Sequence, residues 1–174
     1  MIYAIKSDLI ITTSRKPSQI TRRFAQFIRH YFDAVYINRG KMSFRKVVNF
    51  AKQEENSLLL ILTETKGNPS NIDIYDVQAD DENPIANIYF NISLPSQNNR
   101  INVDSSEIFF VNKSKSLDEF FDNLTGIDAK EHIEKNCIII TDDDENMAKA
   151  IFIDKNGQDC RYKVYIKGFN LNGD

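Results

Sequence analysis

The sequence predicts an α/β fold in which mixed β-sheets are covered by helices. Over the first 65 residues, apolar and β-branched runs alternate with amphipathic helical segments in the order βαβαβ. Connections of this kind favour a parallel or mixed sheet, and further strand-like runs around one helical segment follow. A chain of 174 residues can bury about 70% of its unfolded surface in one core. We therefore expect a single domain over residues 1–174.

The first predicted strand and helix meet at a basic loop. Residues 8–13 are apolar and β-branched and stop at the turn-forming residues 14–17, which predicts a buried strand that ends in a loop. Ser18 is suited to cap the helix that follows. The apolar residues of this helix recur at the spacing of one helical face and are Ile20, Phe24, Phe27, Ile28 and Tyr31.

A second strand and helix repeat this arrangement. Residues 34–37 predict a short strand, which is closed by residues 38–40. Gly40 can adopt the positive φ that a tight strand-to-helix turn needs. A second helix is expected to begin near Ser43, because the apolar residues after it again follow the helical period. Residues 57–63 predict a third strand that is fully buried.

The second part of the chain contains more strands and fewer helices. Alternating apolar and polar residues predict half-exposed strands at 72–77 and 86–92. Polar segments around them indicate a boundary between an N-terminal half of about 1–84 and a C-terminal half of about 85–174. The other predicted elements are strands at 108–111, 137–140, 150–153 and 161–166, a helix at 116–124, and a hairpin turn at Asn156-Gly157.

Charge is distributed unevenly along the chain. The formal net charge is −3, but residues 1–53 contain 11 basic and 2 acidic residues, a balance of +9, and the remainder has a balance of −12. A whole-chain sum hides such a distribution. The basic segment is typical of a surface that binds a polyanion, and the acidic remainder is suited to a basic protein partner.

Both strand-to-helix loops combine basic side chains with a helix N-terminus. Arg15 and Lys16 precede the first helix, and Arg39 and Lys41 precede the second. Free N–H groups at a helix start attract anions, and the loops at the carboxyl ends of an open α/β sheet lie at one edge. Residues 22–23 put two arginines and no acid in the first helical turn, so an anionic ligand would relieve the conflict with the helix dipole. We expect one phosphate-binding patch, with two solvated charged loops as the alternative.

Four aromatic residues near these loops have two alternative roles. Tyr31, Phe32, Tyr36 and Phe44 either stack on nucleic-acid bases or belong to the hydrophobic core. The core is the more frequent place for aromatic residues at these spacings.

No motif indicates a cofactor, a metal site or a catalytic site. The sequence lacks the glycine-rich nucleotide-binding motifs, Cys-x-x-Cys and His-Glu-x-x-His. Residues 142–145 are acidic but lack the spacing of a calcium-binding loop, so we expect a solvated turn. Cys137 and Cys160 are expected to be buried thiols, and His30 and His132 to be surface or cap residues.

The sequence also predicts a cytoplasmic protein that does not contact membranes. No run approaches the roughly 18 apolar residues that span a bilayer. The first six residues lead directly into a predicted strand and do not resemble a signal segment.

The residues of the two basic loops resemble those of a known family. Residues 12–18 (Thr-Thr-Ser-Arg-Lys-Pro-Ser), Thr21 and Phe24 in the helix, and residues 36–43 (Tyr-Ile-Asn-Arg-Gly-Lys-Met-Ser) are similar to the archaeal Brix-domain ribosome-biogenesis proteins. The resemblance is sharpest over residues 8–65 and weaker afterwards.

This resemblance implies an α/β domain of two similar halves, each like the anticodon-binding domain of class IIa aminoacyl-tRNA synthetases. It implies binding of precursor ribosomal RNA (rRNA) during rRNA processing and subunit assembly, and no catalysis. The basic motif of the family corresponds here to Arg15, Lys16, Arg39, Gly40 and Lys41. Together with residues of the adjacent helices, the expected RNA-binding residues are Arg15, Lys16, Ser18, Arg22, Arg23, Arg39, Gly40, Lys41 and Arg45.

Precursor rRNA is therefore the expected partner. Ribosomal proteins or other assembly factors are expected to bind the acidic C-terminal half. A protein-interaction scaffold whose association with RNA is indirect is one alternative function. A small-nucleotide or phosphoester enzyme that uses residues 14–18 is a second alternative.

Overall fold

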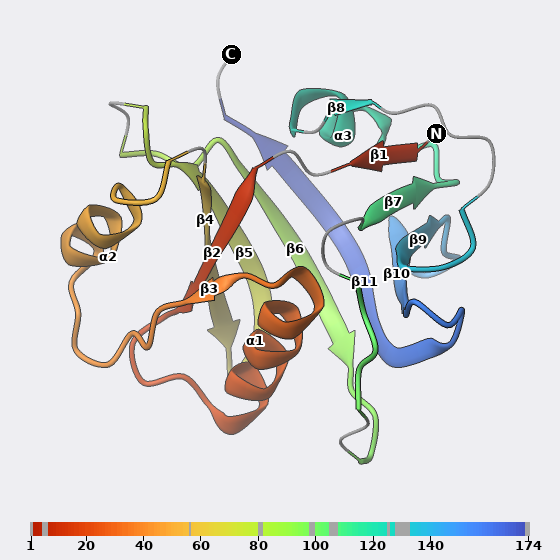
Figure 1. Cartoon of the computed structure of the whole chain (residues 1–174), viewed down its shortest axis with the longest axis horizontal. Coiled ribbons are helices and arrows are strands. Elements are labelled where there is room, and N and C mark those ends of the chain that lie inside the picture. Colours follow the sequence, from red (N-terminus) through yellow and green to blue (C-terminus); the bar gives the residue numbers. More distant parts are fainter. Residues whose placement is uncertain are drawn as a thin grey trace. The chain divides into compact units, whose positions relative to one another are not determined.

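A computed structural model describes residues 2–4, 7–55, 57–79, 82–97, 100–104, 108–124, 126–127 and 133–172. The helices are α1 (Gln19–Phe32), α2 (Phe44–Ala51) and α3 (Asp118–Leu124). The strands are β1 (Ile2–Ala4), β2 (Asp8–Thr13), β3 (Val35–Tyr36), β4 (Ser57–Thr65), β5 (Asn68–Asp76), β6 (Ala86–Ser93), β7 (Phe109–Asn112), β8 (Gly126–Ile127), β9 (Cys137–Thr141), β10 (Ala148–Ile153) and β11 (Asp159–Leu171), as labelled in Figure 1. The predicted α/β fold with both parallel and antiparallel strand pairs is confirmed.

The chain forms two compact units, and each contains a segment from the opposite end of the sequence. One unit comprises Ser7–Tyr89 and Phe169–Asp174 and is called the α1α2 unit. The other comprises Met1–Lys6 and Phe90–Gly168 and is called the α3 unit. Strands β6 and β11 contribute to both units, since the boundaries fall inside them.

The α1α2 unit is built on a mixed sheet with the strand order β3-β2-β4-β5-β6. Strand β2 is parallel to β3 and β4, whereas β5 is antiparallel to β4 and β6. Helix α2 packs on the face that carries Leu59 and Ile61. Side chains alternate along a strand, so the buried Leu60 and Leu62 point to the opposite face. Helix α1 contacts β2, β4 and β5 there, and the core of the unit lies between the helices and the sheet.

The predicted starts of both helices of this unit, at Ser18 and near Ser43, are confirmed. The Ser18 Oγ accepts from the Thr21 N–H at 3.2 Å, and the Ser43 Oγ accepts from the Lys46 N–H at 3.2 Å. These bonds satisfy N–H groups that the first turn of a helix leaves without partners. Gly40 has the expected positive φ of 48°.

The turn between β4 and β5 is shorter than its sequence indicates. Residues 66–70 have turn-forming composition, but only Lys66 and Gly67 form the turn, and β5 begins at Asn68. Pro69 is buried within the strand opposite Glu64, next to a shift in register. A proline has no N–H group to donate to a regular ladder, and the irregular register at this position makes that loss tolerable.

The α3 unit contains the strand order β11-β10-β9-β7-β1-β8. Strands β7 and β9 are parallel, whereas β1 is antiparallel to β7 and β8, and β10 is antiparallel to β9 and β11. The hairpin turn at Asn156-Gly157 is confirmed, with a φ of 82° at Gly157. Tyr3 of β1 is 0% exposed and stacks on Phe121 with 4.9 Å between ring centroids. The N-terminal strand is thus part of the core of this unit.

Several expectations about individual residues are also settled. Cys137 and Cys160 are free and buried, and burial raises their pKa values to about 11 and about 12. Residues 142–145 form a bent loop in which Asp143 accepts from the Asn146 N–H at 3.1 Å. His30 is exposed, while His132 lies outside the described residues.

No three or more His, Cys, Asp or Glu side chains of the described segments are grouped so that they could hold a metal ion. Within the same segments, no helix has the length and apolar character needed to cross a membrane.

Candidate nucleic-acid interface

The parallel strands of the α1α2 unit bring three loops to one edge of its sheet. Residues 14–18 follow β2, residues 37–43 follow β3, and residues 66–67 follow β4. Because β2 is parallel to both neighbours, the carboxyl ends of all three strands lie on the same side. The expectation that both basic loops share one edge is confirmed, and the third loop adds Lys66, which the sequence analysis did not select.

Arg39 joins the loop after β3 to the carboxyl end of β2. Its Nε donates to the Met42 carbonyl oxygen at 2.8 Å, and its Nη1 donates to the Thr13 carbonyl oxygen at 3.1 Å. Only 8% of Arg39 is exposed. Burial, and secondly the positive charge of Arg15, lower the pKa of Arg39, while the Tyr75 hydroxyl acts in the opposite direction. The guanidinium therefore organises the loops from within the protein.

The N-terminus of α1 is already occupied by a carboxylate of the chain itself. The Glu64 Oε2 accepts from the Ser18 N–H at 3.0 Å and from the Thr21 Oγ1 at 2.5 Å. The Thr21 bond first, and then the Ser18 N–H bond, lower the pKa of Glu64 below its ordinary value. Ser18 also donates through its Oγ to the Gly67 carbonyl oxygen at 2.6 Å. Glu64 thus supplies the anion that the sequence suggested would come from a ligand, and Ser18 is bonded within the protein.

The remaining basic residues at this edge have exposed side chains. We define the cationic edge as six exposed basic residues at this edge: Arg15, Lys16, Lys41 and Lys66 of the three loops, Arg22 of α1 and Arg45 of α2. Gly40 is exposed beside them, whereas Arg23 is partly buried and has other interactions within the protein. Of the nine residues expected from the sequence, five are in the cationic edge. Arg39 and Ser18 instead hold the loops together.

Two lysines of the cationic edge have left-handed backbone conformations. The φ angles of Lys16 and Lys66 are 53° and 51°. Such conformations are uncommon for residues other than glycine and cost roughly 1–2 kcal/mol. Strained residues persist where the surrounding structure fixes them, and here the Ser18 to Gly67 bond joins the two loops.

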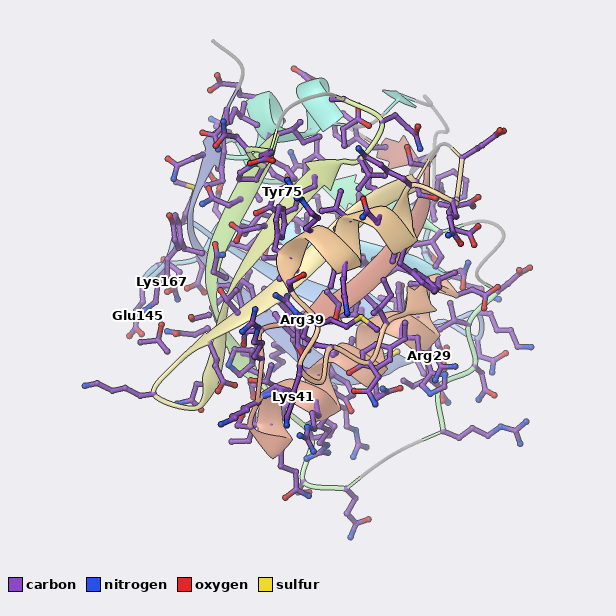
Figure 2. All side chains as sticks on the ribbon, turned by 90° about the vertical axis from the view of Figure 1, so that its left-hand side faces the viewer. Arg29, Arg39, Lys41, Tyr75, Glu145 and Lys167 are labelled. Atoms are coloured by element: carbon purple, nitrogen blue, oxygen red, sulfur yellow. The ribbon has the colours of Figure 1, made fainter. Side chains whose placement is uncertain are left out.

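A groove lies beside the cationic edge, between α2 and β5. Its volume is about 250 Å³, and its lining consists of Phe44, Arg45, Val48, Asn49, Lys52, Tyr75, Asp76, Val77, Ala79 and Glu82. The rings of Phe44 and Tyr75 are tilted by 52° with centroids 5.1 Å apart. Figure 2 shows Tyr75, Arg39 and Lys41 on the same side of the unit. The position of Phe44 on α2 was predicted from the helical period. Its ring contact with Tyr75 was not, because the two residues are 31 positions apart in the sequence.

The chain is similar along almost its whole length to an archaeal protein. It is 29% identical to the "Probable Brix domain-containing ribosomal biogenesis protein" of Methanothermobacter thermautotrophicus over 94% of this chain and 99% of that protein. A protein of the same name from Archaeoglobus fulgidus is 39% identical over 67 residues, which cover 38% of this chain and 40% of that protein. No family model matches the chain.

Solved structures agree with this similarity. The chain matches Mil, an archaeal Imp4-like protein, with a TM-score of 0.78 and 28% identity over 94% of this chain and 99% of that one. A probable ribosomal biogenesis protein from Aeropyrum pernix has the same fold, with a TM-score of 0.69 at 18% identity over 92% and 96% of the two chains. The resemblance to archaeal Brix-domain proteins that the sequence indicated is confirmed.

Proposed function

We propose that this chain is a Brix-domain ribosome-biogenesis factor that binds precursor rRNA through the cationic edge and assists rRNA processing and subunit assembly. The similarity to a protein named for ribosomal biogenesis extends over 94% of the chain and supports the biological role. The proposal also includes the other expectations from the sequence: one domain over residues 1–174, halves like the class IIa anticodon-binding domain, a cytoplasmic location and no catalytic activity.

The observation that carries RNA binding is the convergence of six exposed cations from three loops and the starts of two helices. Arg15, Lys41 and Lys66 come from loops after three different strands, yet all three strands end at one edge. Guanidinium and ammonium groups bind phosphate oxygens, and arginine does so through two parallel hydrogen bonds. Contacts to phosphates position a protein on RNA without reading its sequence. The cationic edge is accordingly suited to a folded RNA backbone.

Charge reversal tests this proposal directly. We expect the double variant Arg15→Glu, Lys41→Glu to bind transcribed rRNA fragments at least about tenfold more weakly than the wild type, because two charged hydrogen-bonding groups are replaced by anions. The matched control is Lys155→Glu, Lys167→Glu, which makes the same change in net charge at exposed residues of the α3 unit. Affinity can be measured by fluorescence anisotropy. Equal losses in both double variants would show that only net charge matters and would contradict a localised site.

A protein-interaction scaffold is the second candidate. It is favoured by the α3 unit, which contains 14 acidic and 11 basic residues and could bind a basic ribosomal protein or another assembly factor. In that case the purified chain would not bind RNA, and the same charge reversals would abolish a protein contact instead. A nucleotide-dependent enzyme is disfavoured, because Glu64 already occupies the N-terminus of α1.

A further inference from the structure

Building on the proposed RNA-binding function, we propose that the groove between α2 and β5 holds one unpaired nucleobase of the bound RNA. The base would lie against the Phe44 and Tyr75 rings. The cationic edge would hold the phosphates on either side. The chain would then prefer RNA in which at least one base is free of a duplex.

The size of the groove fits one planar ring system. Its volume of about 250 Å³ lies below the roughly 300–1,000 Å³ of pockets for drug-sized ligands. All lining residues belong to the α1α2 unit, and Val47 and Leu59 are part of the core beneath α2. The groove therefore has α2 on one side and β5 on the other, and both elements pack on the core of the unit.

The two aromatic rings provide the stacking surface. Phe44 and Tyr75 are both partly buried and pack against the core under α2, while part of each ring lines the groove. Packing against the core fixes their positions, with 5.1 Å between centroids. Stacking of bases on aromatic side chains is the common means by which proteins hold single-stranded RNA. The role left open for Phe44 between core packing and base stacking thus includes both.

The polar residues of the groove match a nucleotide better than an apolar ligand. Arg45 and Lys52 lie on the α2 side, and Asp76 and Glu82 on the β5 side. The cations suit the phosphates that flank a base. Carboxylates only accept hydrogen bonds, so they suit the exocyclic amino groups of adenine, cytosine or guanine, which uracil lacks. An RNA base is therefore a better occupant than an aromatic side chain of a partner protein.

The groove is continuous with the cationic edge. Arg45 belongs to both sets of residues. The buried Arg39 bonds to the Met42 carbonyl oxygen in the loop that contains Lys41, and it is close enough to Tyr75 and Arg15 for both to influence its pKa. An RNA strand on the cationic edge can therefore reach the groove without leaving the surface of one unit.

The test compares single-stranded with double-stranded RNA. Binding of fluorescent oligo(A) and of an oligo(A)·oligo(U) duplex of the same length is measured for the wild type, Phe44→Leu and Tyr75→Leu. We expect both variants to lose about five- to a hundredfold in affinity for oligo(A), because one stacked base contributes this much, and to bind the duplex unchanged. Phe50→Leu is the matched control, since Phe50 is on the same helix and 44% exposed but does not line the groove.

Each other outcome overturns the proposal in a distinguishable way. An equal loss for oligo(A) and duplex would indicate damage to the fold, and unchanged oligo(A) binding would exclude a base in the groove. If the leucine variants bind normally while Arg15→Glu, Lys41→Glu does not, the proposed function stands and the base site does not exist. If the wild type binds neither RNA, both proposals fail. Quenching of 2-aminopurine within the oligonucleotide by the wild type but not by Tyr75→Leu would support the stacked geometry directly.

Discussion

The Arg39 guanidinium donates to two main-chain carbonyl oxygens, that of Thr13 at the end of β2 and that of Met42 in the loop after β3. A lysine has a single nitrogen and cannot reproduce this fork. We expect Arg39→Lys to lower the free energy of unfolding by about 1.5–3 kcal/mol, the usual contribution of hydrogen bonds to a charged group, as measured by urea denaturation. Arg45→Lys, a matched change at an exposed position, should leave stability unchanged. If Arg39→Lys instead alters only RNA affinity, Arg39 contacts phosphate directly.

The Glu64 carboxylate predicts a specific dependence of stability on pH. Its pKa is lower in the folded protein than the ordinary 4.5, so its stabilising effect is fully present above pH 4.5 and is lost as pH falls through the folded pKa. Glu64→Gln removes the charge while keeping the shape. The wild type should therefore be more stable than Glu64→Gln at pH 7, and the difference should shrink toward pH 3. Urea denaturation across this range measures it, and a constant difference would show that ionisation of Glu64 does not stabilise the fold.

The local backbone features of this site could be predicted from the sequence, whereas its long-range contacts could not. The helix caps Ser18 and Ser43 and the positive φ of Gly40 follow from local backbone requirements, which can be read from neighbouring residues in the sequence. Glu64 and Arg39 depend on contacts over 46 and 26 residues, respectively. Such contacts become visible only when the strands are paired, so neither the role of Glu64 nor the internal bonds of Arg39 could be predicted from the sequence.

At the scale of elements, the periodic segments and the short strand β3 were predicted, whereas strands β1 and β8 were not. Helix α1 and strands β2 and β4 each contain enough apolar residues to show their period. Strand β1 has three residues, too few for a pattern, and its partner in β7 is more than 100 residues away in the sequence, as in the pair Ile2 and Val111. The membership of the N-terminus in the α3 unit therefore follows only from the structure.

Strand β1 is expected to stabilise the α3 unit through Tyr3. This ring is fully buried, stacks on Phe121, and donates to the Asp122 carboxylate at 3.3 Å. We expect Tyr3→Ala to cost about 3–5 kcal/mol, as for other large aromatic side chains removed from a core, and Tyr3→Phe to cost about 1 kcal/mol for the lost hydrogen bond. Thermal or urea unfolding gives these values. In native-state hydrogen exchange, protection should fall in β7 and β9, and unchanged protection there would show that β1 is dispensable.

For the whole molecule, the charge asymmetry of the sequence is not an asymmetry between the units. The α1α2 unit contains 11 basic and 11 acidic residues, because its sequence range also includes the acidic residues between positions 54 and 82. Charge is instead separated within this unit. The N-terminus of α2 is at the cationic edge, and Glu54 and Glu55 follow its C-terminus, toward the opposite edge of the sheet. A neutral unit can therefore present a strongly basic surface.

This separation predicts how RNA binding depends on salt. Counterions leave the RNA when cations neutralise its phosphates, so the logarithm of the affinity falls with the logarithm of the salt concentration by about 0.7 per phosphate for single strands. Six contacts by the cationic edge give a slope of about −4. We expect Arg15→Glu, Lys41→Glu to reduce the slope by about 1.5, and Lys155→Glu, Lys167→Glu to leave it unchanged, in anisotropy titrations at several salt concentrations. A wild-type slope near −1 would mean that few phosphates meet the cationic edge. Equal slopes in the two double variants would mean that RNA responds to the charge of the whole protein, and this edge would then be no more than a set of solvated loops.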